Sequence, residues 1–344
     1  MVRWTRHLYE IVEEGTAYVT CAIRTVSNPN CALCHTPGFP LYSGLRDRIF
    51  DAPGEWNLKR CPDPKCGLVW LDPMPVEEDI ANAYKRYYTH ERHEEGGATL
   101  RALSILTIRK LIYRLIGVGR LTQEHKKLWA MYVDDMAPGR LLDVGCGSGA
   151  RLLHFQKAGW EVEGQEIDPE AAESARKTAK ARVFCVPLES AGLAAHSYDV
   201  IIMNHVIEHV HRPIDLLREC GRIVKPGGLI VAVTPNSESC GHKHFGKFWR
   251  GLEPPRHVFI YCPASIAHLA DQSGFGHFDI WTSAANAEDV FLRSASLESQ
   301  EAGGSGSIVR TRTRAFRFLR REYVETRTNG VGGEDLVLRI HTSV

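Results

Sequence analysis

One short stretch constrains the fold of this chain more than any other. The apolar segment Leu141–Val144 runs directly into Gly145-Cys146-Gly147-Ser148-Gly149, and a helical pattern of apolar residues follows from Leu152 to Phe155. A strand that enters a helix through glycines leaves bare backbone at the helix N-terminus, against which a ligand can lie. The turn therefore predicts a cofactor site that a dinucleotide or S-adenosylmethionine (SAM) could fill.

The segments after this turn alternate between strand-like and helix-like patterns. Such alternation is typical of a doubly wound α/β fold with a mostly parallel sheet. A Pro-Gly stop at residues 225–228 separates one expected helix from the next strand. We therefore predict a seven-stranded, Rossmann-like sheet with strands at 140–144, 161–167, 182–186, 198–204, 229–234, 278–282 and 336–341, and with helices at 169–180, 213–224 and 263–271.

The chain is long enough for one large domain and a smaller one. Changes of composition divide it into parts with different expected structures. These are an N-terminal extension (1–30), a Cys-rich module (31–75), a helical connector or lid (76–137), the cofactor-binding core (138–283), a basic and partly flexible insertion (284–330) and the final strand of the core sheet (331–344).

The composition of the chain bears on its binding partners and on the cellular compartment in which we expect it. The formal net charge of +1 gives no whole-chain argument for nucleic acid or for an anionic membrane. We see no secretory signal in residues 1–26 and no apolar run long enough to span a membrane. We therefore expect a cytoplasmic protein whose ten cysteines are thiols and metal ligands rather than disulfides.

A carboxylate about 20 positions after the glycine turn tests the cofactor prediction, because such a group accepts hydrogen bonds from ribose hydroxyls. Glu166 occupies that place at the end of the second expected strand, and Asp168-Pro169 follows it. We expect Glu166 to bind ribose and Asp168 to cap the next helix. The alternative is that Glu166 is itself only part of a cap.

Five motifs in order carry a family resemblance. They are Leu141–Gly149, Glu166–Glu170, Tyr198–Ile201, Asn204–Val210 and Leu217–Pro235, which contains Val224-Lys225-Pro226-Gly227-Gly228. In this order they resemble the motifs of class I SAM-dependent methyltransferases over about residues 138–283 and the closing strand.

The resemblance implies roles for particular residues. Asp143 would orient the turn and the amino group of the cofactor, Glu166 would bind both ribose hydroxyls, and Asn204 would hold the methionine end through its carbonyl. The turn would pass its backbone under the cofactor, and adenine would lie near the residues after the second and third strands. The expected SAM contacts are thus Asp143, Gly145, Cys146, Gly147, Gly149, Glu166, Ile167, Leu188 and Asn204.

The Cys-rich module predicts a structural zinc ion. Cys31-x2-Cys34 and Cys61-x4-Cys66 form two close pairs, as tetrahedral zinc requires, and Gly67 would ease the second turn. A segment this short buries little core, so a metal would supply its stability. The alternatives are unconnected reduced cysteines, or His35 as a substitute ligand. The run from Cys61 to 75 resembles the N-terminal zinc module of some bacterial sugar C-methyltransferases.

Candidate catalytic residues follow the fourth expected strand. His205, Glu208 and His209 are spaced so that a helix would bring them together around one proton or one ion. Ubiquinone-pathway O-methyltransferases are similar here, but with Glu in the first position. The alternative is that these groups form hydrogen bonds within the fold.

The segment from Thr234 to Tyr261 is too long for an ordinary connection, and such loops are usually functional. Sugar C-methyltransferases carry a catalytic histidine at a matching place, and a neutral imidazole suits proton removal at neutral pH, so we expect His257 to be a general base. Its alternative role is capping the next helix. Arg256 could pair with an acceptor phosphate or be a surface cation. His242-x-His244 is a weaker metal candidate, and the expected acceptor contacts are Trp249, Arg250, Arg256 and Tyr261.

These features favour a SAM-dependent methyltransferase acting on a small or carrier-linked acceptor, such as a sugar nucleotide, a polysaccharide precursor or a natural product. A zinc-containing RNA methyltransferase would use the basic run Arg310–Arg321 as a grip, although no nucleic-acid partner is expected. A dinucleotide-dependent oxidoreductase would also fit the glycine turn. A peripheral membrane protein would use residues 108–120 as a basic amphipathic helix beside that basic run.

Overall fold

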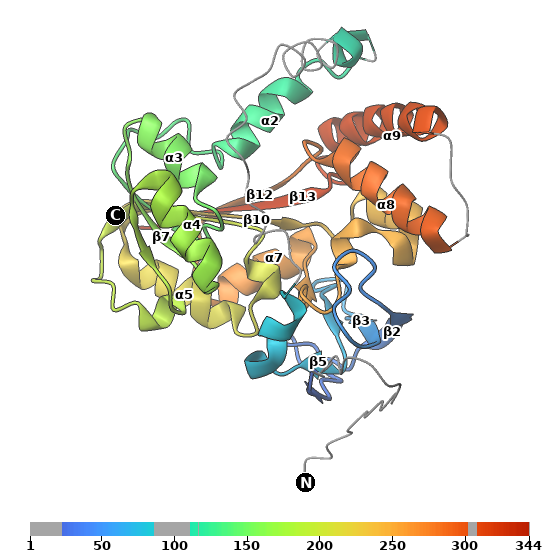
Figure 1. Cartoon of the computed structure of the whole chain (residues 1–344), viewed down its shortest axis with the longest axis horizontal. Helices are drawn as coiled ribbons and strands as arrows, with labels where there is room; N and C mark the ends of the chain where they lie inside the picture. The colour runs from blue at the N-terminus through green and yellow to red at the C-terminus, as the bar shows by residue number, and fades with distance from the viewer. Residues whose placement is uncertain (1–22, 86–110, 116, 302–307, 344) are drawn as a thin grey trace, which may run out of the picture.

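A seven-stranded sheet dominates the computed structural model, which describes residues 23–85, 111–115, 117–301 and 308–343 (Figure 1). Its strand order is β12-β13-β10-β9-β6-β7-β8. All strands run parallel except β13, which pairs antiparallel with both β10 and β12. The strands are β6 (Arg140–Val144), β7 (Glu161–Gln165), β8 (Arg182–Phe184), β9 (Tyr198–Asn204), β10 (Val224–Pro235), β12 (Phe278–Ser283) and β13 (Asp335–His341).

This sheet confirms the predicted doubly wound fold, with small differences at the strand ends. β10 begins at Val224 rather than at Leu229, because Val224 pairs with Tyr198 across a break in the register. β7 ends at Gln165, so Glu166 lies beyond the last strand residue rather than within it. That difference releases Glu166 to turn toward the glycine loop.

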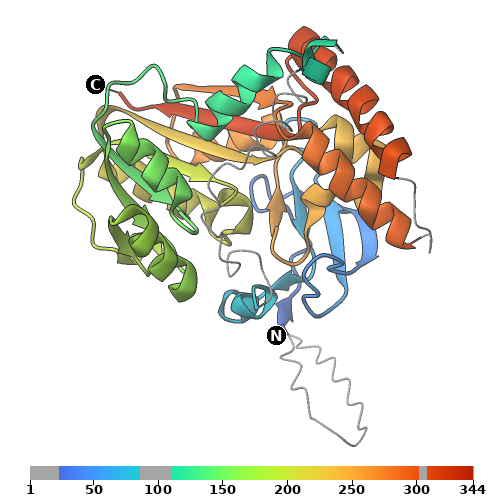
Figure 2. The same cartoon turned by 45° about the horizontal axis from the view of Figure 1, so that its top comes forward.

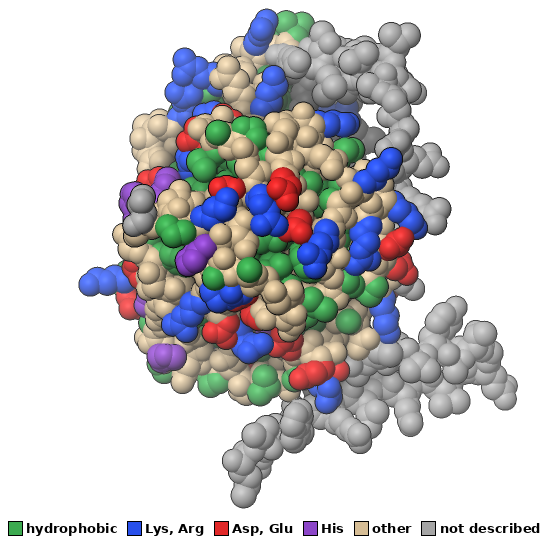
Figure 3. All heavy atoms as spheres, turned by 90° about the vertical axis from the view of Figure 1, so that its left-hand side faces the viewer, with side chains coloured by type: hydrophobic (Ala, Val, Ile, Leu, Met, Phe, Trp, Pro, Cys, Tyr) green, Lys and Arg blue, Asp and Glu red, His purple; other side chains and the backbone are tan. Residues whose placement is uncertain are grey.

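Helices cover both faces of the sheet, as apolar parallel strands require. α3 (Ala150–Lys157) and α4 (Pro169–Ala179) pack Phe155 and Ala175 against one face. α5 (Pro213–Ile223) and α7 (Pro263–Gln272) pack Leu217 and Ile266 against the other. The surface over these elements in Figure 3 mixes cationic and anionic side chains, in keeping with a net charge near zero.

The Cys-rich module forms a second sheet, and one of its strands comes from far away in the sequence. The sheet order is β11-β4-β3-β2, with β2 at Phe39–Leu45, β3 at Trp56–Arg60, β4 at Val69–Leu71 and β11 at Phe259–Ile260. A short pair, β1 (Thr25–Val26) and β5 (Met74–Pro75), closes the module. Because β11 belongs to the loop after β10, the module is joined to the core by backbone hydrogen bonds.

The connector is less helical than expected where the structure describes it. It contains a 3-10 helix, η1 (Glu77–Ala83), a helical turn at 111–115, and α2 (Leu121–Trp129). Residues 86–110 and 116 of the expected helical connector lie outside the described residues. Tyr113 and Val118 are buried against Leu319 and Tyr323 of the C-terminal helix pair, so this segment packs inside the fold. No helix in the described ranges has the length and apolarity to span a bilayer.

Residues 284–330 form a helix pair, α8 (Ala287–Glu301) and α9 (Ile308–Asn329), over one end of the sheet beside the Cys-rich module (Figure 2). The pattern of residues predicts no clear element here, because arginines interrupt the apolar positions of α9. Its buried face is a narrow stripe of Ala315, Phe318, Leu319 and Glu322. The expected flexible segment at 302–307 lies outside the described residues.

A buried pair of carboxyl groups ties α9 to the sheet. Glu322 and Glu334 are both buried, and Glu322 Oε1 accepts from the Glu334 backbone N–H at 3.0 Å. Burial raises the pKa of Glu334 to about 7, opposed by donation from Trp249 and Ser239 and reinforced by the charge of Asp335. Burial, and then the charge of Glu334, also raise the pKa of Glu322. At least one proton is therefore held between these groups in the folded state.

We expect this pair to make the protein less stable as the pH rises. The folded state binds the proton more tightly than the unfolded chain, so stability falls from the ordinary glutamate pKa, about 4.5, through about 7. The loss should be on the order of 3 kcal/mol. Urea unfolding of wild type between pH 5 and 8, beside Glu322→Gln and an exposed control in α8, Glu298→Gln, measures it. A pH slope that Glu322→Gln leaves unchanged would contradict this origin.

Candidate functional site

The glycine turn lies between β6 and α3, and its three glycines have different reasons to be glycine. All three have positive φ: 66° at Gly145, 53° at Gly147 and 80° at Gly149. A Cβ at Gly145 would lie 2.5 Å from Val206 Cγ2, and one at Gly149 would lie 2.7 Å from the Cα of Ala175. A Cβ at Gly147 would meet nothing within 4 Å. Packing therefore explains Gly145 and Gly149, whereas Gly147 borders open space of the kind a bound cofactor needs.

Two carboxylates after β7 have separate tasks. Glu166 Oε2 accepts from the Gly147 N–H at 2.9 Å, and Oε1 accepts from the Asp168 N–H at 3.0 Å. Asp168 Oδ1 accepts from the Ala171 N–H at 2.8 Å, which caps α4. Glu166 thus faces the glycine turn and Asp168 is the cap. Next to Glu166, the side chain of Ile167 is 61% exposed and offers an apolar surface beside the turn.

Asp143, at the end of β6, is a buried carboxylate that lacks a donor. Its Oδ2 has no hydrogen-bond partner among the described residues. Burial, and more weakly the charge of Glu166, raise its pKa to about 7. Buried polar atoms are normally paired, so this unpaired oxygen beside the glycine turn could accept a hydrogen bond from a bound ligand. The amino group of SAM is a donor of the type that this oxygen lacks.

The remaining expected cofactor residues lie around this turn. Cys146 is buried, and its N–H donates to the Gln165 carbonyl at 3.0 Å, which fixes the loop to β7. Leu188 is buried at the start of a 3-10 turn, η3 (Leu188–Ser190), so its side chain is part of the core. Asn204 is the last residue of β9, at the carboxyl edge of the sheet. Together these positions surround the edge where ligands of such sheets bind.

His205 and Glu208, beyond β9, form a hydrogen-bonded pair. Glu208 lies in a 3-10 turn, η4 (Ile207–His209), rather than in the longer helix that we expected. Its Oε1 is 3.1 Å from His205 Nδ1, and its Oε2 accepts from Thr234 Oγ1 at 2.9 Å. His205 Nε2 lies 3.6 Å from Asp335 Oδ1.

The charges of this pair stabilise each other. Burial favours the neutral forms, but the hydrogen bond to His205 prevails and lowers the pKa of Glu208 to about 2. Burial likewise opposes a raised pKa at His205, which the Glu208 contact nevertheless produces. With its pKa raised, His205 releases a proton less readily than an ordinary imidazole, and its Nδ1 is already engaged by Glu208. The structure therefore favours a supporting role for His205.

His257 lies in the loop after β10, and its side chain is buried. This loop contains α6 (Cys240–Phe245) and two 3-10 turns, η5 (Gly246–Phe248) and η6 (Arg250–Leu252). His257 Nδ1 lies 2.8 Å from the Gly251 carbonyl, so Nδ1 carries the proton and Nε2 the lone pair. Nε2 lies 3.8 Å from Glu253 Oε2 and 4.0 Å from Glu208 Oε1. Burial, and then nearby His209, lower the pKa of His257 to about 4, so the ring is neutral at pH 7.

His209 joins the site to the connector. Its ring packs against His257 at 4.7 Å, and its Nδ1 lies 3.0 Å from the Arg256 carbonyl and 2.9 Å from the Tyr84 hydroxyl. Burial lowers the pKa of His209. Burial raises the pKa of Tyr84, and the charges of Glu253, Glu208 and Glu166 act on it as well. Tyr84 of the connector therefore contacts His209 directly, a contact that the sequence pattern did not reveal.

The expected acceptor residues are mostly held by protein partners. Trp249 Nε1 donates to Glu334 Oε2 at 2.8 Å, and Arg250 pairs with Glu253. Arg256 is fully buried, so it is not a surface cation, and its guanidinium is used in ion pairs within the fold. Tyr261 differs, because its buried hydroxyl has no hydrogen-bond partner among the described residues.

Two groups of side chains in the described ranges have spacing suited to a metal ion. One is Glu208, His209 and His257, and the other is the four cysteines. His242 and His244 do not form such a group. His242 bridges the Ser237 carbonyl and the Tyr42 hydroxyl, at 2.6 and 3.1 Å, whereas His244 packs among phenylalanines such as Phe291.

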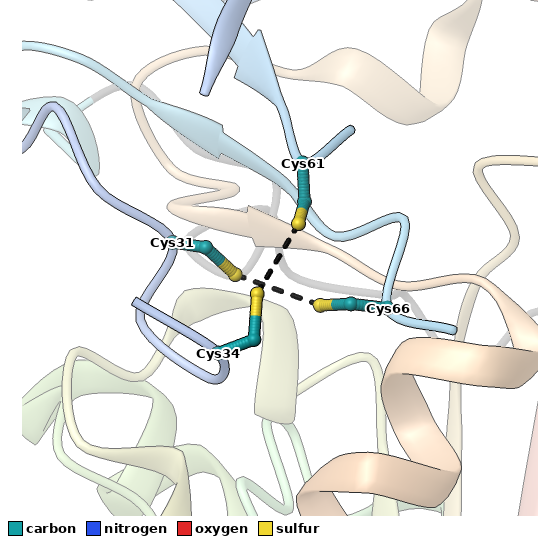
Figure 4. A group of neighbouring side chains, drawn as sticks. All are labelled: Cys31, Cys34, Cys61 and Cys66. Carbon is teal, nitrogen blue, oxygen red and sulfur yellow. Dashed lines mark hydrogen bonds between the residues drawn. The ribbon is translucent and has the colours of Figure 1, made fainter. Parts of the chain in front are cut away.

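The four cysteines converge from two turns, as Figure 4 shows. Cys31 Sγ lies 3.5 Å from Cys66 Sγ, and Cys34 Sγ lies 3.3 Å from Cys61 Sγ. A disulfide requires about 2.05 Å, whereas sulfurs bonded to tetrahedral zinc at about 2.3 Å lie about 3.8 Å apart. Four thiols at this spacing fit a zinc ion. His35 is not in the group.

Comparison with known proteins identifies the class of enzyme that the sequence motifs resemble, the methyltransferases. Residues 117–276 match the family model described as "Methyltransferase domain". A ubiquinone biosynthesis O-methyltransferase of Parvibaculum lavamentivorans is 30% identical over 138 residues, which are 38% of this chain and 53% of the relative. The corresponding enzyme of Vibrio cholerae is 33% identical over 115 residues, or 30% of this chain and 47% of the relative. The chain thus spans about half the length of the curated relatives it matches.

Solved structures with similar folds include a SAM-dependent methyltransferase from Archaeoglobus fulgidus. It is 19% identical, and the match covers 67% of this chain and 98% of that chain with a TM-score of 0.44.

Proposed function

We propose that this chain, which carries a class I SAM-dependent methyltransferase domain, methylates a small or carrier-linked acceptor and uses His257 as the general base. The observation that carries the proposal is the cofactor turn itself. Gly147 borders open space, Glu166 faces it, and Asp143 presents an unpaired oxygen at the same edge of the sheet. A dinucleotide site would share the glycines, but the family match favours a methyltransferase.

The cofactor would be held by groups that already surround the turn. SAM would supply a methyl group on a sulfonium, which is a strong electrophile. Glu166 would exchange its contacts with backbone N–H groups for the ribose hydroxyls, and Ile167 would cover one face of the adenine. Asp143 would accept from the amino group, because its Oδ2 lacks a donor. Asn204 would border the methionine end from β9.

The proton acceptor would be Nε2 of His257. The Gly251 carbonyl fixes the proton on Nδ1, which leaves Nε2 able to accept a proton from an acceptor hydroxyl, amine or acidic carbon. The carboxylates of Glu208 and Glu253 lie just beyond hydrogen-bond distance of Nε2, and they would stabilise the imidazolium once it forms. The unpaired hydroxyl of Tyr261 is the best-placed of the expected residues to contact an acceptor.

The cysteines would hold one structural zinc ion through Cys31, Cys34, Cys61 and Cys66. All four positions are filled by protein, as in structural rather than catalytic zinc sites. The ion would therefore take no part in the chemistry. A zinc count of one per chain supports this proposal. A second bound ion would instead assign the group of Glu208, His209 and His257 to metal binding.

An acceptor screen tests the proposed activity. Purified, zinc-loaded protein would be supplied with SAM, and formation of S-adenosylhomocysteine (SAH) would be followed against nucleotide sugars, phenols, amines and short RNA. Phenols are included because the curated relatives are O-methyltransferases of ubiquinone biosynthesis. SAH formation that depends on one small-molecule class supports the proposal. SAH formation with RNA as the only acceptor, at a rate that falls as the salt concentration rises, would contradict the proposal.

A further inference from the structure

The candidate base, His257, lies next to a segment whose backbone is hydrogen-bonded to the Cys-rich module. β11 begins two residues after His257 in the chain and is the edge strand of the module's sheet. Phe259 pairs with Trp70 and Ile260 with Val69, while the Leu71 N–H donates to the Val258 carbonyl at 3.1 Å. The backbone immediately after His257 is therefore part of the module's sheet, although the module lies far earlier in the sequence.

The segment that follows His257 also contacts the cysteine cluster, at Cys262. Cys262 Sγ donates to the Cys66 carbonyl at 3.2 Å, and a Cβ at Gly67 would lie only 3.1 Å from that sulfur. Cys262 is the N-cap residue of α7, so this contact fixes where the loop ends and the helix starts. Any movement of the turn that contains Cys66 would thus be transmitted to the end of the loop.

A carboxylate of the module fixes the other side of the segment. Asp47, between β2 and β3, is buried, and its oxygens accept from the backbone N–H groups of Ile49, Phe50 and Ala52 at 3.0, 3.2 and 3.0 Å. Its Oδ2 also lies 2.8 Å from Arg256 Nη1. Because three backbone groups fix the carboxylate, Asp47 presents a rigid anchor to the arginine that precedes His257.

Arg256 connects Asp47 to the residues around His257. Its Nε donates to Glu253 Oε1 at 2.9 Å, and the other oxygen of Glu253 lies 3.8 Å from His257 Nε2. Its carbonyl lies 3.0 Å from His209 Nδ1, which orients the second imidazole. Arg256 is fully buried, so this arrangement excludes water. Breaking a buried pair of this kind leaves an uncompensated charge, and the local structure should shift.

We propose that the Cys-rich module is the positioning element for the base, and that Asp47 is its positioning residue. The module fixes His257 from both sides: through Asp47 and Arg256 before it, and through β11 and Cys262 after it. A zinc ion in the module would stabilise this arrangement without touching the glycine turn. The effect on turnover rests on the proposed function, whereas the effect on the loop's backbone does not.

The test compares two carboxylates of the same module. Asp47→Asn removes the anchor, whereas the control Asp72→Asn alters a carboxylate that pairs with Lys59 at 2.6 Å and with the Asn28 N–H at 2.7 Å. Zinc content, SAH affinity, hydrogen exchange of peptides covering 253–262, and turnover with the acceptor found by the screen are measured for both. We expect Asp47→Asn to keep its zinc and its SAH affinity within twofold, to exchange at least tenfold faster over 253–262, and to lose kcat at least tenfold at unchanged KM for SAM.

Removal of zinc from the wild-type protein gives a second, independent readout. A chelator should raise exchange over 258–262, while residues 145–149 keep the protection that bound SAH gives them. Exchange over 253–262 that is the same in Asp47→Asn, Asp72→Asn and wild type would overturn the proposal, as would equal loss of SAH affinity and exchange protection throughout the chain. If wild type forms no SAH with any acceptor, the proposed function fails, and the exchange data alone still decide the positioning role.

Discussion

Replacing His257 with glutamine is expected to lower kcat by about 10²–10⁴-fold, the usual contribution of a general base. Glutamine can keep a hydrogen bond to the Gly251 carbonyl through its amide, but it offers no basic lone pair in place of Nε2. Because the hydrogen bond of His257 is to Gly251 in its own loop, the affinity for SAH should stay within about twofold of wild type. Steady-state rates with the acceptor from the screen, and calorimetry with SAH, measure the two effects.

His196→Gln is the matched control for this prediction. His196 also contacts a backbone carbonyl through Nδ1, that of Val224 at 3.1 Å, but it lies at the opposite end of β9 from the site. Its substitution should leave kcat within about twofold. Were His257→Gln to keep more than a tenth of the wild-type kcat, His257 would not be the base, and the proton would have to leave through another group.

Replacing Gly147 with arginine is expected to abolish binding of SAM and SAH. The substitution fills the open space over the turn, where a Cβ meets no protein atom within 4 Å, with a long charged side chain. A smaller change, Gly147→Ala, should weaken SAH binding at least tenfold, or about 1.4 kcal/mol. Calorimetric titration of each variant with SAH measures the loss.

Backbone strain must be separated from loss of the ligand. Gly147 has a φ of 53°, which costs any L-residue about 1–2 kcal/mol in the left-handed region. Gly192 has a φ of 63° and equally open surroundings in a different loop, the one after η3, so Gly192→Ala carries the same strain. The two alanine variants should lose similar stability, and only Gly147→Ala should lose SAH affinity. Equal SAH affinity in both would mean that the cofactor does not lie on the glycine turn.

The core sheet could be predicted from the sequence because its signals are local. The strands β9 and β10 contain continuous apolar runs, glycine or proline residues lie beside β6 and within the start of β10, and the order of the motifs implied the connections. The helix cap at Asp168 could likewise be predicted from the sequence, and the hydrogen bond from the Ala171 N–H confirms it, whereas ribose binding by Glu166 stays a prediction. The cysteine pairs were also visible as spacing, and the structure brings all four sulfurs together.

The remaining features depend on contacts that spacing does not encode. β11 has only two residues and forms a strand because Trp70 and Val69 lie beside it, far away in the sequence. Tyr84 and Asp335 reach the histidines from the connector and from the last strand. From the sequence alone, Arg256 could be an acceptor ligand or a surface cation, and only the structure shows its ion pair with Asp47. In each case the missing information was which distant segment packs against the loop.

The most direct test of this account is a calorimetric titration of zinc-loaded wild-type protein with SAH. We expect one SAH per chain with a micromolar dissociation constant, which is about −8 kcal/mol at 25 °C. A folded, zinc-loaded protein that binds no SAH would contradict it, because the open turn at Gly147, the orientation of Glu166 and the unpaired oxygen of Asp143 would then need another explanation.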